Sequence, residues 1–453
     1  MGDGVGMGGA VRPARAGLSA AARVEAALAR IAAQDGRLRA VIEPLAETAR
    51  AEAAASDARA AAGASRGPLD GVLVGIKDNL AVAGRPRTGG IGALAGDVRA
   101  RDAGAVARLR AAGAVVLARL NMHEGATGGT SDNLWFGRCV NPLGGSREPP
   151  PSPGGSSGGS AVAVVAGFVE VALGTDTLAS VRLPAAFCGL AGIKPTFGVV
   201  GRSGLLPMAR SLDVIGPLAR DVRGLWPVLA AIAGEDAEDP DSVPPPAFWA
   251  AGPGWRADLG GVRLGRPVQV DAVAMEPEAR AAFEHAASAA RRLGAEVRDV
   301  DLAGWRPAES RRAGLAIAQA EGAAALGPMP DMAAEGIGAE LRAFLAAGAA
   351  MSAEALSAAR AEARAGTEAL ERAEAEVDAL ILPTSPQRAF PHGAPPPHPL
   401  SVFTALANLS GRPALTLPVP AEGLPGAVQL MGPMFSDPLL IALGAALEDA
   451  LPG

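Results

Sequence analysis

The sequence predicts an α/β fold in which the strands are covered by helices on both faces. Short apolar runs alternate along the chain with longer alanine-rich segments of helical periodicity, which is typical of α/β proteins. The chain has 453 residues, of which 49% are hydrophobic and 19% are charged. This length and composition are those of a globular protein with a large core.

The N-terminal part of the chain is predicted to be helical. Over residues 19–62, apolar side chains recur every three or four positions, which indicates two helices packed on the outside of the main domain. A turn-rich break follows at residues 63–70. We therefore expect residues 1–62 to form a helical lead-in and residues 63–453 to form a single domain.

The remaining elements follow from the same periodicities. Strands are predicted at residues 71–76, 114–117, 262–270, 295–300, 377–382, 414–419 and 427–430. Helices are predicted at residues 103–112, 160–168, 280–293, 310–375, 402–409 and 438–447, the longest being interrupted near Gly327–Pro330. Glycine, proline and serine predict a loop at residues 141–159, and proline predicts surface connections at 244–257 and 391–399.

Charge and cysteine content argue against several classes of protein. The net charge of −6 argues against a nucleic-acid-binding surface. Cys139 and Cys188 are too few for a disulfide framework and lack zinc-site spacing. The longest apolar stretch, residues 161–174, contains Glu170 and is too short to span a membrane, and the first twenty residues lack the pattern of a signal peptide. A cytoplasmic protein is therefore expected, without membrane or direct nucleic-acid contact.

Lysine is rare in this chain. Of 41 basic residues only Lys77 and Lys194 are lysines, and the others are arginines. A buried lysine can lose its proton near neutral pH, whereas an arginine cannot. Each lysine is therefore a candidate base.

Three segments carry candidate chemistry, namely Gly75-Ile-Lys-Asp-Asn79, Gly154-Gly-Ser-Ser-Gly-Gly-Ser160 and Gly174–Gly189. The second segment could cradle a phosphate, act as a linker or present a serine on a strained backbone. It lacks the lysine of a P-loop, which disfavours the first of these interpretations. A serine nucleophile needs a base, and Lys77 at a strand end is a better candidate than any of the four histidines, at positions 123, 285, 392 and 398.

These segments, in their order along the chain, resemble the amidase signature family of serine hydrolases. The resemblance also includes Asn121-Met-His-Glu124, Lys194-Pro-Thr-Phe-Gly198, Ser211-Leu-Asp-Val-Ile-Gly-Pro217 and Gly423–Pro433. It covers roughly residues 60–450. It implies a large mixed β-sheet covered by helices on both faces, with residues 63–453 as one catalytic domain.

The resemblance also implies a Ser–cis-Ser–Lys triad. Ser180 would be the nucleophile, Ser156 the proton relay after a cis Gly155–Ser156 peptide bond, and Lys77 the neutral base. The backbone of Thr177, Leu178 and Ala179 would stabilise the oxyanion. Ala126 and Gly128 would lie near the substrate, and Ser157, Asp176 and Arg182 would support the structure, as would Lys194. No metal or organic cofactor is implied.

The chain departs from the family pattern before the nucleophile. Leu178-Ala179 stands where the family usually has two glycines. Leu178 is expected to line the acyl pocket. If the backbone at Ala179 needs a positive φ, the alanine is strained by roughly 1 kcal/mol or more, which would distort the oxyanion hole.

The predicted function is hydrolysis of the C–N bond of a small-molecule amide through an acyl-enzyme. Three alternatives stay open: the A subunit of a glutamyl-tRNA amidotransferase-like complex with B and C subunits, a carboxybiuret or allophanate hydrolase, and a degenerate, non-catalytic scaffold. A homodimer is a further possible assembly.

Overall fold

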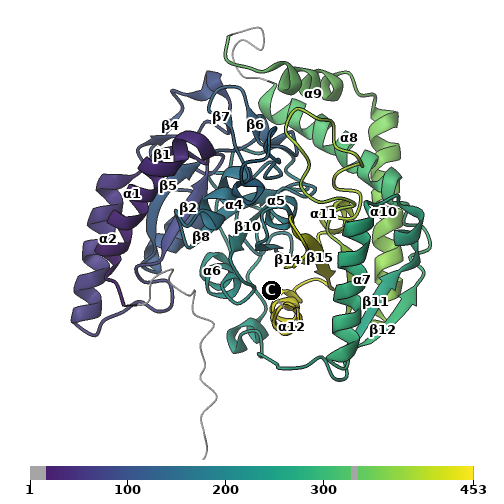
Figure 1. The fold of residues 1–453 in the computed structure, drawn as a ribbon. Coiled ribbons are helices and arrows are strands. Elements are labelled where there is room, and N and C mark those ends of the chain that lie inside the picture. Colours follow the sequence, from purple (N-terminus) through teal and green to yellow (C-terminus); the bar gives the residue numbers. More distant parts are fainter. Residues whose placement is uncertain (1–16, 328–334, 452–453) are drawn as a thin grey trace, which may run out of the picture.

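The computed structural model describes residues 17–327 and 335–451 (Figure 1). At its centre is an 11-stranded sheet in the order β1-β5-β2-β8-β10-β9-β14-β15-β13-β11-β12. The strands are β1 (Val41–Pro44), β2 (Leu73–Lys77), β5 (Val115–Leu120), β8 (Val171–Asp176), β9 (Ala191–Lys194), β10 (Val214–Ala219), β11 (Arg263–Pro267), β12 (Glu296–Val300), β13 (Ala379–Pro383), β14 (Ala414–Val419) and β15 (Gly426–Met431). Two short hairpins lie outside this sheet, β3 (Arg85–Pro86) with β4 (Val98–Arg99), and β6 (Asp132–Asn133) with β7 (Gly137–Arg138).

The sheet is mixed, as predicted. β2 runs parallel to β5 and β8, and β11 runs parallel to β12 and β13. The strands between these two groups pair antiparallel, from β8 through β10, β9, β14 and β15 to β13. All residues of β2, β5, β8 and β10 are buried, because these strands are covered on both faces.

Helices cover both faces of the sheet. They are α1 (Ala20–Leu38), α2 (Ala46–Ala61), α3 (Gly104–Ala111), α4 (Gly158–Val165), α5 (Arg182–Phe187), α6 (Leu225–Ile232), α7 (Pro277–Arg292), α8 (Pro307–Leu326), α9 (Ala339–Ala349), α10 (Ala353–Glu374), α11 (Ala405–Leu409) and α12 (Asp437–Asp449). In Figure 1, α1 and α2 lie at one end of the molecule, and α8, α9 and α10 lie at the other.

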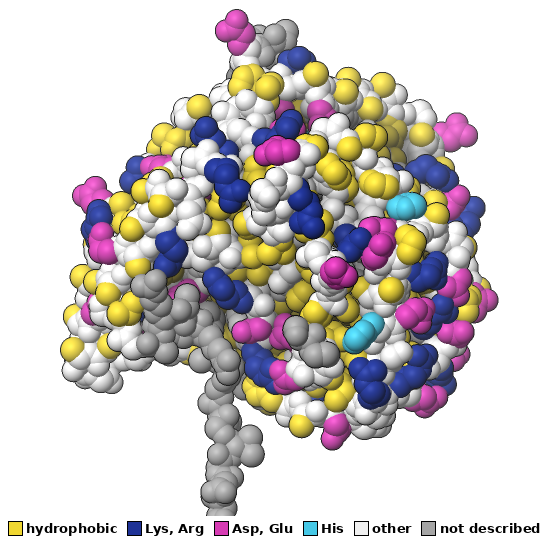
Figure 2. All heavy atoms as spheres, viewed as in Figure 1, with side chains coloured by type: hydrophobic (Ala, Val, Ile, Leu, Met, Phe, Trp, Pro, Cys, Tyr) yellow, Lys and Arg dark blue, Asp and Glu magenta, His cyan; other side chains and the backbone are white. Residues whose placement is uncertain are grey.

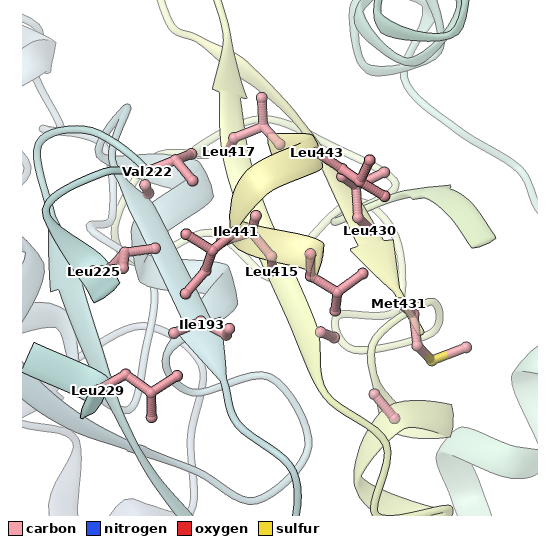
Figure 3. Packing of buried hydrophobic residues seen from close by; sticks show 14 of the residues in the cluster. Ile193, Val222, Leu225, Leu229, Leu415, Leu417, Leu430, Met431, Ile441 and Leu443 are labelled. Carbon is pink, nitrogen blue, oxygen red and sulfur yellow. The ribbon is translucent and has the colours of Figure 1, made fainter. Parts of the chain in front are cut away.

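The larger core lies between the sheet and helices such as α6 and α12. Figure 3 shows Leu225 and Leu229 of α6 and Ile441 of α12 facing Ile193 and Leu415 of the sheet. A second core, on α1, α2 and α4, covers the opposite face of β5 and β8. Within the described residues, no helix is both long and apolar enough to cross a membrane.

Several predicted elements need correction. The segment 19–62 contains a strand between its two helices, and this strand, β1, pairs with β5 and forms one edge of the main sheet. The strands β8, β9 and β10 were not predicted, because short runs bounded by glycine and proline show no clear periodicity. The division of the chain near residue 62 stays a prediction.

The C-terminal half also differs in detail from the prediction. The segment 310–375 forms three helices, α8, α9 and α10, and part of the predicted interruption near Gly327–Pro330 lies outside the described residues. The predicted strand 262–270 ends at Pro267 and continues as a 3-10 turn. His392 lies in a predicted surface segment but is buried, with its Nε2 2.7 Å from the carbonyl oxygen of Cys139.

Candidate active site

Lys77 ends β2 in the middle of the parallel part of the sheet. Its Nζ donates hydrogen bonds to Ser156 Oγ at 2.8 Å and to Thr175 Oγ1 at 2.8 Å. The amide of Asn79 also donates to Thr175 Oγ1, at 3.0 Å. The lysine is therefore held between the serine loop and the adjacent strand β8.

The environment of Lys77 favours its neutral form. The side chain is fully buried. Burial lowers the pKa of Lys77 to about 7, although the negative charges of Asp213 and Asp176 act in the opposite direction. A large fraction of this lysine can therefore lose its proton near neutral pH.

The loop before α4 carries Ser156 to the lysine. The peptide bond between Gly155 and Ser156 is cis, as the resemblance implied. Ser131 holds this loop, because its Oγ donates to the Gly154 carbonyl at 2.8 Å and accepts from the Gly158 N–H at 3.0 Å. Gly154 has a φ of +79°, and a Cβ there would lie 3.0 Å from Pro184 Cα, so the loop needs glycine at this position.

Ser180 lies in the loop between β8 and α5. The N–H of Ser157 donates to the Ser180 carbonyl at 3.3 Å, which joins this loop to the one that carries Ser156. Ser157 Oγ in turn donates to the Thr175 carbonyl at 3.2 Å. Ser180 is half-buried and lines a pocket, and its Oγ makes no hydrogen bond to any described residue.

A buried ion pair fixes the two ends of the nucleophile loop. Arg182 Nη2 lies 3.0 Å from Asp176 Oδ1, and both side chains are fully buried. Arg182 also donates to Asn408 Oδ1 at 2.6 Å and to Gln429 Oε1 at 3.1 Å. Burial acts to raise the pKa of Asp176, but the charge and hydrogen bonds of Arg182 outweigh it and lower that pKa. The pair is thus placed to hold the loop rather than to face the pocket.

Leu178 and Ala179, which stand where the family usually has two glycines, do not strain the loop. Ala179 is not among the residues with positive φ, so alanine fits its conformation without the penalty considered above. Leu178 lines the pocket and lies against α8, where a Cβ on Gly314 would come within 2.6 Å of its Cδ2. Both side chains are therefore accommodated.

The pocket beside Ser180 has a volume of about 400 Å³. Thr177, Leu178, Ala179 and Ser180 form one wall, and α8 and α9 contribute Arg311, Leu315, Gln319, Glu340 and Phe344 to another. Ala126 and Gly128 also line it, and their contact with a substrate stays a prediction. A Cβ on Gly128 would lie 2.2 Å from His123 Cε1, so a larger residue there would have to displace the His123 ring.

The remaining candidate bases lie outside this arrangement. Lys194 is buried, donates to the Pro195 carbonyl at 2.7 Å and does not line the pocket, although burial lowers its pKa too. His123 Nε2 lies 3.2 Å from Glu340 Oε2, and the histidine side chain makes no hydrogen bond to Ser156 or Ser180. Among the residues that the structure describes, no group of three or more His, Cys, Asp or Glu side chains is arranged to hold a metal ion.

Several residues of the site were not predicted from the sequence. Asn79 lies in the segment 75–79 with Lys77, and Thr175 lies in the segment 174–189 next to Asp176, but no role was expected for either residue. Nothing in the sequence around Ser131 indicated a role in the site. Arg311 lies on α8 and Glu340 on α9, where neither periodicity nor motif indicates which side chains face a distant loop.

The fold and the site define a class of protein, an α/β protein with a large mixed sheet in which a buried lysine is hydrogen-bonded to a serine and a second serine lines a pocket. A family model described as Amidase matches residues 22–441. The chain therefore belongs to the amidase family, as the resemblance implied, and is an amidase-family enzyme that acts on C–N bonds.

Individual relatives span almost the whole chain. The A subunit of the glutamyl-tRNA(Gln) amidotransferase of Anaeromyxobacter dehalogenans (strain 2CP-C) is 39% identical over 479 residues, which cover 97% of this chain and 96% of the relative. The native peptide amidase of Stenotrophomonas maltophilia is 34% identical with a TM-score of 0.81, covering 96% and 94% of the two chains. A structure described as a vestigial protein complex that reveals the origins of an s-triazine catabolic enzyme is 32% identical with a TM-score of 0.85, covering 95% of each chain.

Proposed function

We propose that this protein is an amidase that hydrolyses the amide bond of a small molecule, with Ser180 as nucleophile, Ser156 as relay and Lys77 as base. The observation that carries the proposal is the 2.8 Å hydrogen bond from the buried Lys77 Nζ to Ser156 Oγ. A lysine with a pKa of about 7 can accept a proton at neutral pH.

In the first half of the reaction, neutral Lys77 takes the proton of Ser156 as Ser156 takes that of Ser180. Ser180 Oγ then bonds to the amide carbon, and the carbonyl becomes an oxyanion. Backbone N–H groups of the loop at Thr177–Ser180 stabilise this oxyanion, and each such donor is typically worth ~10²–10³ in rate. As the C–N bond breaks, the proton returns through Ser156 to the leaving nitrogen, which leaves an acyl-enzyme.

Water completes the cycle. The same relay removes a proton from a water molecule, whose oxygen bonds to the acyl carbon. The ester bond to Ser180 breaks, the carboxylic acid leaves, and the proton returns to the serine. Asp176 and Arg182 support this sequence by fixing the ends of the nucleophile loop, whereas Ala126 and Gly128 lie along the pocket that would hold the substrate.

The proposal is tested with a fluorophosphonate probe and a panel of aliphatic, aromatic and urea-type amides. Wild-type protein should be labelled and should release ammonia or amine, whereas S180A should do neither and K77A should be strongly impaired. S410A, a change of a half-buried serine at the end of α11 that does not line the pocket, is the control for handling and folding. Equal turnover by wild type and S180A would contradict the mechanism. A wild-type protein that is neither labelled nor active would instead favour a non-catalytic scaffold.

A second candidate function is glutaminase activity as the A subunit of an amidotransferase-like complex. It is favoured by the relative from Anaeromyxobacter dehalogenans, which is 39% identical and bears the name of that component. In this case the isolated chain should release little ammonia from glutamine, and addition of the B and C subunits should raise the rate. Full activity of the isolated chain on other amides, with none on glutamine, would favour the first proposal.

A further inference from the structure

One face of α8 forms a wall of the pocket. Arg311, Leu315 and Gln319 are spaced by four residues, so they follow one another along the same side of the helix, and all three line the pocket. Leu315 is apolar, whereas the two ends of this row are polar. The row thus places a cationic group at one end of an otherwise uncharged helix face.

Arg311 adjoins the part of the pocket close to the nucleophile loop. Its Nε donates to the Leu400 carbonyl at 2.6 Å. The side chain of Leu400 in turn lies near Gly129 and Leu183, since a Cβ on Gly129 would be 2.6 Å from Leu400 Cδ1 and 3.6 Å from Leu183 Cδ2. Leu183 follows Ser180 by three residues, and all of these residues line the same pocket.

The guanidinium of Arg311 has no carboxylate partner among the described residues. Its hydrogen bond to Leu400 uses only Nε, which leaves both Nη groups without a described acceptor. Elsewhere in the protein, the buried arginines Arg119, Arg182 and Arg202 each form an ion pair with an aspartate. Arg311 is half-buried and lacks such a partner, so its charge is not compensated within the described chain.

The carboxylate of the pocket already has a partner other than Arg311. Glu340 is the one carboxylate among the described residues that line the pocket, and its Oε2 lies 3.2 Å from His123 Nε2. A partly desolvated charge without a counter-ion is costly, and a bound anion removes that cost. A carboxylate suits the two free Nη groups, because a guanidinium binds a carboxylate through two parallel hydrogen bonds.

We infer that Arg311 binds a carboxylate of the substrate, so that the protein acts on amides that also bear a carboxylate group. This inference rests on the proposed amidase function and adds the substrate class to it. A purely structural role for Arg311, as a tie between α8 and Leu400, would make no distinction between anionic and neutral amides.

The test compares matched substrates. Glutaramate and pentanamide differ only in a carboxylate on the acyl side, and 4-acetamidobenzoate and acetanilide differ only in a carboxylate on the leaving-group side. For the pair whose carboxylate reaches Arg311, wild type should favour the anionic member in kcat/KM by about 10- to 100-fold, mainly through KM, as expected for one charged hydrogen-bonded contact. R311M should abolish this ratio, and R311K should restore part of it.

The neighbouring Arg312 provides the control. It pairs with Glu309 at 2.8 Å on the exposed side of α8, so R312M removes a positive charge nearby without touching the pocket and should keep the wild-type ratio. Equal kcat/KM for both members of both pairs in wild type, or a ratio that R311M leaves unchanged, would overturn the inference. A loss that R311M shows equally on anionic and neutral amides would also overturn it, in favour of a structural tie.

Failure of the proposed function is a separate outcome. If no amide is hydrolysed, binding of the same two pairs of amides, measured by calorimetry, decides the carboxylate site without turnover. Wild type should bind the anionic member of at least one pair at least about 10-fold more tightly than its neutral counterpart, and R311M should not. Equal binding within both pairs by wild type would overturn the inference.

Discussion

Titration of Lys77 should govern the pH dependence of amide hydrolysis. With a pKa of about 7, roughly one tenth of the lysine is neutral at pH 6 and roughly nine tenths at pH 8. The value of kcat/KM should therefore rise about tenfold between pH 6 and pH 8 and level off above that range, because kcat/KM reports the free enzyme.

The assay is release of ammonia or amine from a neutral amide, measured under kcat/KM conditions from pH 5.5 to 9.5. A lysine with the ordinary pKa of 10.5 would be only about 0.3% neutral at pH 8, so the rate would keep rising about tenfold per pH unit through pH 9. Such a profile would refute the argument that burial tunes this base.

Substitution of Lys77 distinguishes its role as a proton acceptor from its role as a positive charge. K77R keeps a cation that cannot serve as a neutral base, so its rate should fall by about 10²–10⁴, close to that of K77M. Substantial activity of K77R at neutral pH would contradict the role of Lys77. Because arginine is larger than the buried lysine, urea denaturation of both variants should accompany the kinetics.

Stability gives an independent measure of the same pKa. The pKa of about 7 in the folded state lies below the ordinary value of 10.5, so the unfolded state binds more protons between these two pH values. The cost of burying the charged lysine is fully present below pH 7 and disappears as the pH rises toward 10.5. Relative to K77M, wild type should therefore gain about 4–5 kcal/mol of unfolding free energy across this window. If the difference in unfolding free energy between wild type and K77M does not change with pH, the lowered pKa of Lys77 would be contradicted.

The other predictions concern the supporting structure. R182M should lower the free energy of unfolding by about 3–5 kcal/mol in urea, since it leaves the buried Asp176 unpaired, and a loss within error would exclude a structural role. G159A should destabilise the protein strongly, because a Cβ there would lie 2.2 Å from the backbone that follows β5, whereas G36A, with nothing within 4 Å, should be neutral or slightly stabilising by thermal denaturation. A179G should not raise kcat, because the alanine already fits its backbone, and a severalfold increase would show a strained oxyanion loop.

Local patterns in the sequence were sufficient for much of the fold, whereas the family resemblance supplied the three triad candidates, whose catalytic roles stay a prediction. Burial of the apolar run before Lys77 follows from its composition, and the motifs around Ser156 and Ser180 place each serine in a loop next to a helix. The strands β8, β9 and β10 were missed because their apolar runs are short and interrupted by glycine and proline. Pairing with long-range neighbours, rather than local periodicity, decides that these segments are strands.

The molecular surface was also only partly predictable. On the face shown in Figure 2, basic and acidic side chains are interspersed, as the small net charge and the abundance of arginine suggest. That Arg311 has no carboxylate partner among the described residues follows from the packed structure alone. Arg311 and Arg312 are neighbours in the sequence, yet one lines the pocket and the other pairs with Glu309 on the outside of α8.

The sequence by itself determined the amidase family, the mixed sheet and the choice of Lys77 as the candidate base, because these depend on which residue types stand in order along the chain. Only the tertiary structure decided that Thr175 and Asn79 hold this lysine, that Ala179 fits its loop, and that α8 and α9 complete the pocket. The pKa of Lys77 is also decided at that level, because it depends on burial by strands and loops up to a hundred residues away. The scarcity of lysine indicated two candidate bases, and the fold supplies the dry environment in which one of them, Lys77, is hydrogen-bonded to a serine.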